Sequence, residues 1–106
     1  MQLGIDLVQI SELKKRLDDE SLLAKVFTTS ELQQNSRVES LAGIYAAKEA
    51  FFKALGKKLN WLDVWIEKIE TGMPTIHSAH LNNLNATVSI SHSGDYATAV
   101  VVIESI

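Results

Sequence analysis

The sequence of 106 residues contains no cysteine and only one proline. The absence of cysteine excludes disulfide bonds, thiolate metal sites and a cysteine nucleophile. No uninterrupted apolar run approaches the ~20 residues that a membrane helix needs, and the first residues lack the basic region and apolar stretch of a signal peptide. The net charge of −3 argues against nucleic-acid binding, which needs a basic surface. We therefore expect a cytoplasmic protein that contacts neither a membrane nor nucleic acid.

Apolar residues make up 46% of the chain and charged residues 22%, which is typical of an ordinary globular protein. The length suits a single domain over residues 1–106. A chain of this size buries roughly 60–65% of its unfolded surface, so self-association would help its stability.

Patterns of apolar residues and turn signals predict an α+β fold: a mainly antiparallel sheet packed with one long helix and shorter helices. Ser11 is expected to cap the first helix, and Thr28 with Glu31 forms a capping box at the start of another. Gly56 suits the C-terminal end of the long helix. Strands are predicted over residues 3–10, 61–69, 87–93 and 96–103, helices over 12–18, 21–27 and 37–55, a turn at 72–74 and a polar loop at 82–85.

The long helix has one apolar arc that must face the core, formed by Leu41, Ile44, Tyr45, Phe51, Phe52 and Leu55. Lys48 falls near the centre of that arc, so its ammonium needs an anion or a route to solvent. Glu49 and Lys53 lie one turn apart on the flank of the arc, within reach of one another. From spacing alone, the preferred interpretation is a Lys48 side chain that reaches solvent and an ordinary surface ion pair of Glu49 and Lys53. The alternative is a carboxylate and two amines that face a phosphorylated ligand.

Asp6 is an unusual residue within an apolar strand, because strands disfavour aspartate and a buried carboxylate needs a cation or several donors. A satisfied structural aspartate is one interpretation. The other is a metal site, since Asp6 and Glu49 together would suit Mg²⁺, which is often held by one or two carboxylates plus substrate phosphates.

Residues 89–94, Ser-Ile-Ser-His-Ser-Gly, place hydroxyls, an imidazole and a glycine at a strand end, where they can donate hydrogen bonds to phosphate oxygens. Such clusters are also common in loops. His77 and His80 are spaced for a metal pair, but they are expected to lie in a polar loop without further obvious ligands. We interpret them as surface residues.

Several of these segments, in the same order, resemble motifs of the phosphopantetheinyl transferase superfamily. Gly4-Ile5-Asp6-Leu7-Val8 resembles its first motif, and residues 27–31, Phe-Thr-Thr-Ser-Glu, resemble the F-[ST]-x-x-E segment. Residues 48–53, Lys-Glu-Ala-Phe-Phe-Lys, match the most specific motif, K-E-A-x-x-K. Residues 72–74 and 89–93 resemble the later turn and the S-[IL]-S-H-[ST] strand. The short chain points to the bacterial holo-acyl-carrier-protein synthase type.

The resemblance implies transfer of the 4′-phosphopantetheine arm of coenzyme A to a serine of an apo acyl carrier protein, with release of 3′,5′-ADP. Asp6 and Glu49 would bind Mg²⁺ together with the pyrophosphate, although Mn²⁺ accepts the same oxygen ligands. Either Glu49 or a metal-bound water could take the serine proton. The remaining implied contacts are Lys53 with the pyrophosphate, Lys48 as the motif lysine at the cofactor, and Ser91, His92 and Ser93 with the nucleotide phosphates.

The resemblance further implies a homotrimer with shared active sites, in which a neighbouring subunit supplies His92 to the site that contains Asp6. Three positions depart from the family pattern. Glu12 stands where an arginine commonly meets the acidic carrier, and Lys15 and Arg16 on the same helix could compensate. Ile44 replaces an arginine that many relatives carry near the nucleotide, and Lys57 replaces part of a Thr-Gly continuation.

These departures leave a second function open, that of a catalytically weak paralogue that binds coenzyme A or a carrier protein. The sequence does not identify the carrier.

Overall fold

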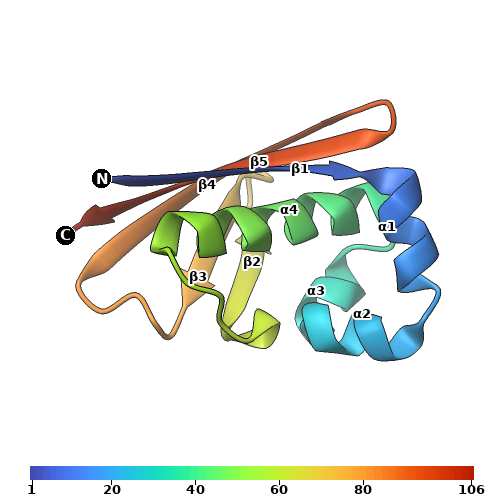
Figure 1. Cartoon of the computed structure of the whole chain (residues 1–106), viewed down its shortest axis with the longest axis horizontal. Coiled ribbons are helices and arrows are strands. Elements are labelled where there is room, and N and C mark those ends of the chain that lie inside the picture. Colours follow the sequence, from blue (N-terminus) through green and yellow to red (C-terminus); the bar gives the residue numbers. More distant parts are fainter.

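A computed structural model describes all residues 1–106 and has five strands, four α-helices and one short 3₁₀ helix (Figure 1). The elements, in chain order, are β1 (Gln2–Gln9), α1 (Ile10–Leu17), α2 (Glu20–Val26), α3 (Thr29–Gln34), α4 (Val38–Leu55), η1 (Trp61–Asp63), β2 (Val64–Lys68), β3 (Pro74–Ser78), β4 (Leu84–Ser93) and β5 (Tyr96–Ser105).

The main sheet has three antiparallel strands in the order β1-β5-β4, and β2 and β3 form a separate antiparallel hairpin. Alternate residues of β1 face opposite sides: Gly4 and Val8 are buried, whereas Leu3, Ile5 and Leu7 are exposed. The register aligns Asp6 with Ala99 and Ile90 across the sheet, and Val8 with Ala97 and His92 in the row two residues further along β1. One face of the sheet is therefore packed and the other is open.

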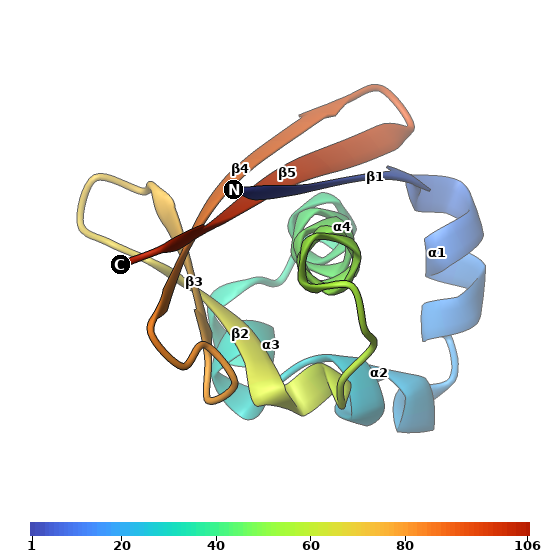
Figure 2. The same cartoon turned by 60° about the vertical axis from the view of Figure 1, so that its left-hand side comes forward.

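Helix α4 is the centre of the molecule. Figure 2 shows it nearly end-on, with the three-stranded sheet on one side and α1–α3, η1 and the β2–β3 hairpin around the rest. Ten of its 18 residues are buried, so the helix is covered on more than one face. Five of the ten are alanines: Ala42, Ala46, Ala47, Ala50 and Ala54. Small side chains let strands and helices approach α4 from several directions.

Most predicted elements are confirmed within a few residues. The capping box is present, because Thr28 Oγ1 accepts from the Glu31 N–H at 3.1 Å while the Glu31 carboxylate accepts from the Thr28 N–H at 2.8 Å. Gly56 ends α4 with a left-handed φ of 82°. Of the predicted apolar arc, Ile44, Phe51 and Phe52 are buried and the other three residues pack against the core.

Three predictions of local structure are wrong. Ser11 does not cap α1, because the helix begins at Ile10 and the Ser11 hydroxyl instead donates to Asp95 at 2.6 Å. The segment predicted as one strand from Trp61 begins with the 3₁₀ turn η1. The segment after the turn at 72–74 forms β3, so His77 lies on a strand, where it stacks on Trp65. Both His77 and His80 are partly exposed, as expected of surface residues.

None of the helices has the length and apolar character needed to traverse a lipid bilayer.

Candidate active site

Strand β1 crosses α4 at unusually close range. A Cβ added to Gly4 would lie 1.9 Å from the carbonyl oxygen of Ala50 and 2.7 Å from the amide nitrogen of Ala54. Only glycine on the strand and small residues on the helix permit this approach. The crossing places Asp6, two residues further on the same face of β1, beside the flank of α4 that carries Glu49 and Lys53.

The Asp6 carboxylate is mostly buried and has a cationic partner. Lys53 Nζ lies 3.1 Å from Asp6 Oδ1 and donates to the carbonyl oxygen of Ile5 at 2.9 Å. The backbone of Asp6 is fixed by the hydroxyl of Thr98, which donates to its carbonyl oxygen at 2.7 Å. Lys53 therefore satisfies the charge that made Asp6 anomalous in the sequence, while about half of the Lys53 side chain stays exposed.

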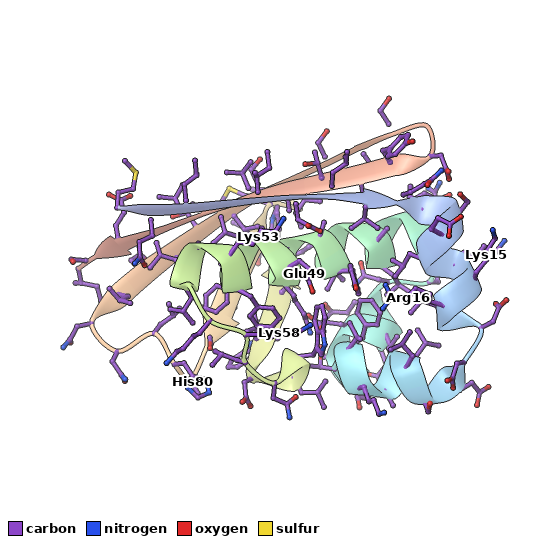
Figure 3. All side chains as sticks on the ribbon, in the orientation of Figure 1. Lys15, Arg16, Glu49, Lys53, Lys58 and His80 are labelled. Atoms are coloured by element: carbon purple, nitrogen blue, oxygen red, sulfur yellow. The ribbon has the colours of Figure 1, made fainter.

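Glu49 does not pair with Lys53, contrary to the expectation from their spacing. Its carboxylate lies 3.8 Å from Lys58 Nζ, just beyond the C-terminal end of α4. Lys53 is engaged with Asp6 instead, because the close crossing of β1 brings that carboxylate nearer. In Figure 3, Lys53 lies on the side of α4 nearer β1, whereas Glu49 lies nearer Lys58, and Arg16 lies further along toward α1.

Asp6 and Glu49 line one open cavity of about 290 Å³ between β1, α1 and α4. Glu12, Arg16 and Tyr45 contribute to its walls. The structure contains no cluster of three or more His, Cys, Asp or Glu side chains arranged for a metal ion. Two carboxylates beside an open cavity nevertheless fit a hard cation that takes its other ligands from substrate phosphates and water. These two carboxylates, Asp6 and Glu49, would be the protein ligands of Mg²⁺ or Mn²⁺.

Arg16 is the cation of α1 that reaches this cavity. Its Nη1 lies 3.3 Å from the Tyr45 hydroxyl, and its guanidinium lies 5.8 Å from the centre of the Tyr45 ring. No carboxylate pairs with it. Lys15 and Glu12 form a pair with each other at 3.3 Å on the exposed surface. Glu12 thus offsets the charge of Lys15, and Arg16 is the unpaired cation beside the cavity.

Lys48 does not contact this cavity, and the prediction that it binds the cofactor is corrected. Its side chain is 0% exposed. Its ammonium donates to Glu31 at 2.8 Å, to the carbonyl oxygen of Val26 at 2.7 Å and to that of Trp61 at 3.2 Å. All three N–H groups are used inside the protein, so none is free for a phosphate. Burial lowers the pKa of Lys48, and the neighbouring Glu31 carboxylate opposes that shift.

Ser91, His92 and Ser93 come together at the end of β4, where they line a shallow hollow with Leu7 and Tyr96. His92 also lines a cavity on the other flank of α4, and that cavity shares no residue with the one that holds Asp6 and Glu49. Asp6 is on β1 and His92 on β4, which are the two edges of the sheet. A single chain therefore does not bring the two groups into one cavity.

The chain is similar to known proteins over nearly its whole length. Residues 2–101 match the family model of the 4′-phosphopantetheinyl transferase superfamily. The chain belongs to this superfamily. It is 40% identical to the holo-[acyl-carrier-protein] synthase of Campylobacter hominis, with 96% of each chain covered. It is 37% identical to that of Bacillus pumilus, with 96% of this chain and 93% of the relative covered.

Solved structures of the family share the fold. The Helicobacter pylori holo-[acyl-carrier-protein] synthase in complex with coenzyme A superposes with a TM-score of 0.91 at 31% identity, covering 96% of this chain and 99% of that one. The Bacillus anthracis enzyme in complex with CoA (3′,5′-ADP) gives 0.89 at 31% identity, covering 99% and 96%. The α+β fold predicted from the sequence is confirmed.

Sequence reasoning missed the role of Glu31 in this member of the transferase superfamily. Besides capping α3, its Oε1 pairs with Lys48 and its Oε2 accepts from the Ile66 N–H at 2.8 Å. A signal was present, since a lysine within an apolar arc demands a buried anion. The segment that contains Glu31 was recognised only as a capping box and a family motif. Tyr45, which orients Arg16, was expected only as a core residue.

Proposed function

We propose that the chain is a holo-[acyl-carrier-protein] synthase, which transfers 4′-phosphopantetheine from coenzyme A to a serine of an apo acyl carrier protein and releases 3′,5′-ADP. The family membership and the similarity to synthases over nearly the whole chain support this activity. The observation that carries the proposal is the joint placement of Asp6 and Glu49 in one cavity, with Lys53 bound to Asp6.

In the reaction, the serine oxygen forms a bond to the β-phosphorus of coenzyme A, and the bond from that phosphorus to the bridging pyrophosphate oxygen breaks. The electron pair leaves with 3′,5′-ADP, and the serine proton passes to a base. The Glu49 carboxylate is a candidate for that base because it lines the cavity and has only a distant partner in Lys58. Lys53, partly exposed beside Asp6, is placed to counter charge that develops on the pyrophosphate.

Asp6 and Glu49 would hold the divalent cation of the reaction, and that cation, when bound, lowers the cost of bringing two anionic phosphates against two carboxylates. The ion pair to Lys53 fixes the direction of the Asp6 carboxylate beside the cavity. Ser91, His92 and Ser93 would supply hydrogen bonds to the nucleotide phosphates, as expected from the sequence. Lys48 is omitted from this set because its ammonium is saturated within the core.

We further propose a homotrimer in which His92 of one subunit completes the cavity that contains Asp6 of the next. The separation of the two residues by α4 within one chain supports this arrangement. The open face of the sheet supplies a surface for association, because Leu3, Ile5 and Leu7 are all more than half exposed there. Leu7 also lines the hollow around His92, so an interface on this face would adjoin the phosphate-binding residues.

An acidic carrier that docks on α1 would meet the cation of Arg16 rather than Glu12. Glu12 repels an acidic partner, but its pair with Lys15 offsets part of that charge. Arg16 is held by Tyr45 at the cavity and has no carboxylate partner. Charge complementarity of this kind acts mainly on the rate of encounter. The cytoplasmic location stays a prediction from the sequence.

The test is to incubate the protein with coenzyme A, Mg²⁺ and several apo acyl carrier proteins and to measure the intact mass of each carrier. We expect one carrier to gain the mass of a single phosphopantetheine arm, and omission of the metal to stop the gain. Glu49→Gln should lower the rate at least about a hundredfold, because it removes a ligand charge. Its stability should change little, since the pair with Lys58 is long and partly exposed.

The matched control is Glu70→Gln, at an exposed carboxylate in the turn between β2 and β3, which should keep the parent rate. Transfer to no carrier would contradict the synthase and favour the paralogue that only binds coenzyme A or a carrier, an alternative to which the departures at Glu12 and Ile44 point. Full activity of Glu49→Gln would remove this residue from the metal site.

A further inference from the structure

The two carboxylates of the candidate active site each have one lysine as a partner, and the two lysines are held differently. Lys53 Nζ lies 3.1 Å from Asp6 and also donates to the carbonyl oxygen of Ile5 at 2.9 Å. Lys58 Nζ lies 3.8 Å from Glu49, which is longer than a hydrogen bond. This long contact is the only ion pair of Lys58, and its side chain is exposed. Lys58 is therefore the partner that is free to move.

The face of Trp61 gives the Lys58 ammonium a second place to bind. Lys58 Nζ lies 4.9 Å from the centre of the Trp61 ring, which is within range of a cation–π attraction. The ring itself is fixed, because Tyr45 stacks on it with centres 5.0 Å apart and Phe52 meets it edge-on at 5.2 Å. The ammonium contacts the ring and the Glu49 carboxylate at the same time. It can therefore leave the carboxylate and keep the ring.

A divalent cation held by Asp6 and Glu49 would compete with Lys58 for the same carboxylate. The Glu49 side chain is only 24% exposed, so a metal ion and an ammonium cannot approach its oxygens from widely separated directions. Two cations close to one carboxylate also repel each other. The bond of Lys53 to the Ile5 carbonyl oxygen holds that lysine in place. Lys58 is thus the cation that a metal ion displaces.

We propose that Lys58 is a positioning residue that holds Glu49 through an internal ion pair, yields it to the divalent cation of the reaction and so raises the metal concentration that the chain needs. This inference rests on the metal site of the proposed function. On displacement, the Lys58 ammonium stays on the Trp61 ring beside the site. Metal affinity is then reduced by what the Glu49–Lys58 pair contributes, and exposed pairs contribute little, which corresponds to about two- to fivefold in Kd.

The test is a titration of the protein with Mn²⁺, in which electron paramagnetic resonance measures the free ion. Lys58→Met should lower the Kd for Mn²⁺ by about two- to fivefold, because methionine keeps an apolar side chain over Trp61 and removes the charge. Lys58→Arg keeps the cation and should bind Mn²⁺ as the parent does. The matched control is Lys57→Met, at an exposed neighbour without an ion pair, which should leave the Kd unchanged at about 0.15 M salt, where distant charges are screened.

The Mg²⁺ dependence of phosphopantetheine transfer gives a second readout. For Lys58→Met, the Mg²⁺ concentration at half-maximal rate should fall by the same factor as the Kd for Mn²⁺, and the change should appear there rather than in kcat. A residue that only supports the fold would not produce this separation, and Lys58→Arg would not restore the parent value. A change in kcat alone would contradict the proposal.

A failure of this inference is distinguishable from a failure of the proposed function. Mn²⁺ constants that differ as expected support the role of Lys58 even where no carrier is modified. Equal constants for the parent and Lys58→Met, or an equal decrease in Lys58→Met and Lys57→Met, overturn it while transfer to a carrier still supports the synthase. Absence of Mn²⁺ binding by the parent and by Lys58→Met overturns both this inference and the metal site on which it rests.

Discussion

At the scale of single residues, Lys48 and Glu31 form a charged pair whose two side chains are fully buried in the core. The three acceptors of the Lys48 ammonium come from the end of α2, from α3 and from η1, and the Glu31 carboxylate also binds the backbone of β2. Every donor and acceptor of the pair is satisfied. The pair thus connects four surrounding elements to α4. Lys48 directly precedes Glu49, which lines the cavity that also contains Asp6.

Replacing Lys48 by Met should lower the free energy of unfolding by about 3–5 kcal/mol, because the variant leaves the Glu31 carboxylate buried without its cation. Urea denaturation followed by tryptophan fluorescence measures this value. Lys57→Met, at an exposed lysine without an ion pair, is the matched control and should stay within about 0.5 kcal/mol of the parent. A Lys48→Met protein as stable as the control would show that the pair is not needed to hold the core.

At the scale of elements, the sequence predicts best those segments whose local pattern agrees with their final environment. Strand β5 and helix α4 have long apolar patterns, and the capping box and Gly56 use interactions that are complete within a few residues. Strand β3 was missed because it is short, begins with proline and buries only Ile76. The start of α1 was misjudged because its partner, Asp95, is 84 residues away in sequence.

The candidate site follows the same rule. Asp6 could be singled out because aspartate is unusual in an apolar strand. Glu49 and Lys53 were noted as a pair on the flank of the apolar arc, and the family motif supplied the expected roles of all three. Which of them pair could not be predicted, because the Asp6–Lys53 contact depends on how closely β1 crosses α4 at Gly4. Lys48 was given a ligand role for a similar reason: its buried partner lies on a different helix.

Helix α1 begins at the turn between β4 and β5 and depends on it. The Asp95 carboxylate accepts from the Ser11 hydroxyl at 2.6 Å and from the Ser11 N–H at 3.0 Å, and the Asp95 carbonyl oxygen accepts from the Ile10 N–H at 2.7 Å. These bonds replace a side-chain cap within α1. The hydrogen bond from the Ser11 hydroxyl lowers the pKa of Asp95 below its ordinary value of 3.8. The same contacts fix the helix that carries Arg16.

This contact predicts a pH-dependent contribution to stability. Because the folded-state pKa of Asp95 is lowered, its contribution is complete above the ordinary pKa and is lost as the pH falls through the folded value. The difference in the free energy of unfolding between the parent and Asp95→Asn should be constant above about pH 5 and shrink below about pH 4. Urea titrations of both proteins from pH 3 to 7 measure it, and other carboxylates cancel in the difference. A difference that does not vary with pH would contradict the assignment.

At the scale of the whole molecule, the sheet is unusual in having one face without cover (Figure 1). Leu3, Ile5 and Leu7 form an exposed apolar row on β1, and Tyr96 on β5 is also exposed. In register with this row are Val102, Val100 and Thr98 of β5. A contiguous apolar surface of this kind is typical of an association interface. Covering it with another copy would enlarge the small core and place another subunit next to the hollow around His92.

The proposed site shared between subunits predicts that two inactive variants restore activity to each other. Asp6→Ala removes the proposed metal ligand, and His92→Ala removes the proposed phosphate contact, so each alone should lose most transfer. Equal amounts of the two variants are unfolded and refolded together. A site is then intact only where one subunit supplies Asp6 and its neighbour supplies His92. Random assembly of a cyclic trimer makes about a quarter of the sites intact. Phosphopantetheine transfer should therefore recover to about a quarter of the parent rate.

The control refolds each variant separately before mixing under conditions that prevent subunit exchange, and this mixture should stay as inactive as its parts. Size-exclusion chromatography with light scattering should give three times the chain mass for the parent and for both variants. If the refolded mixture gains no activity while both variants remain trimeric, each chain holds Asp6 and His92 in a site of its own. The separation of the two residues on opposite flanks of α4 would then have to close by a movement within one chain.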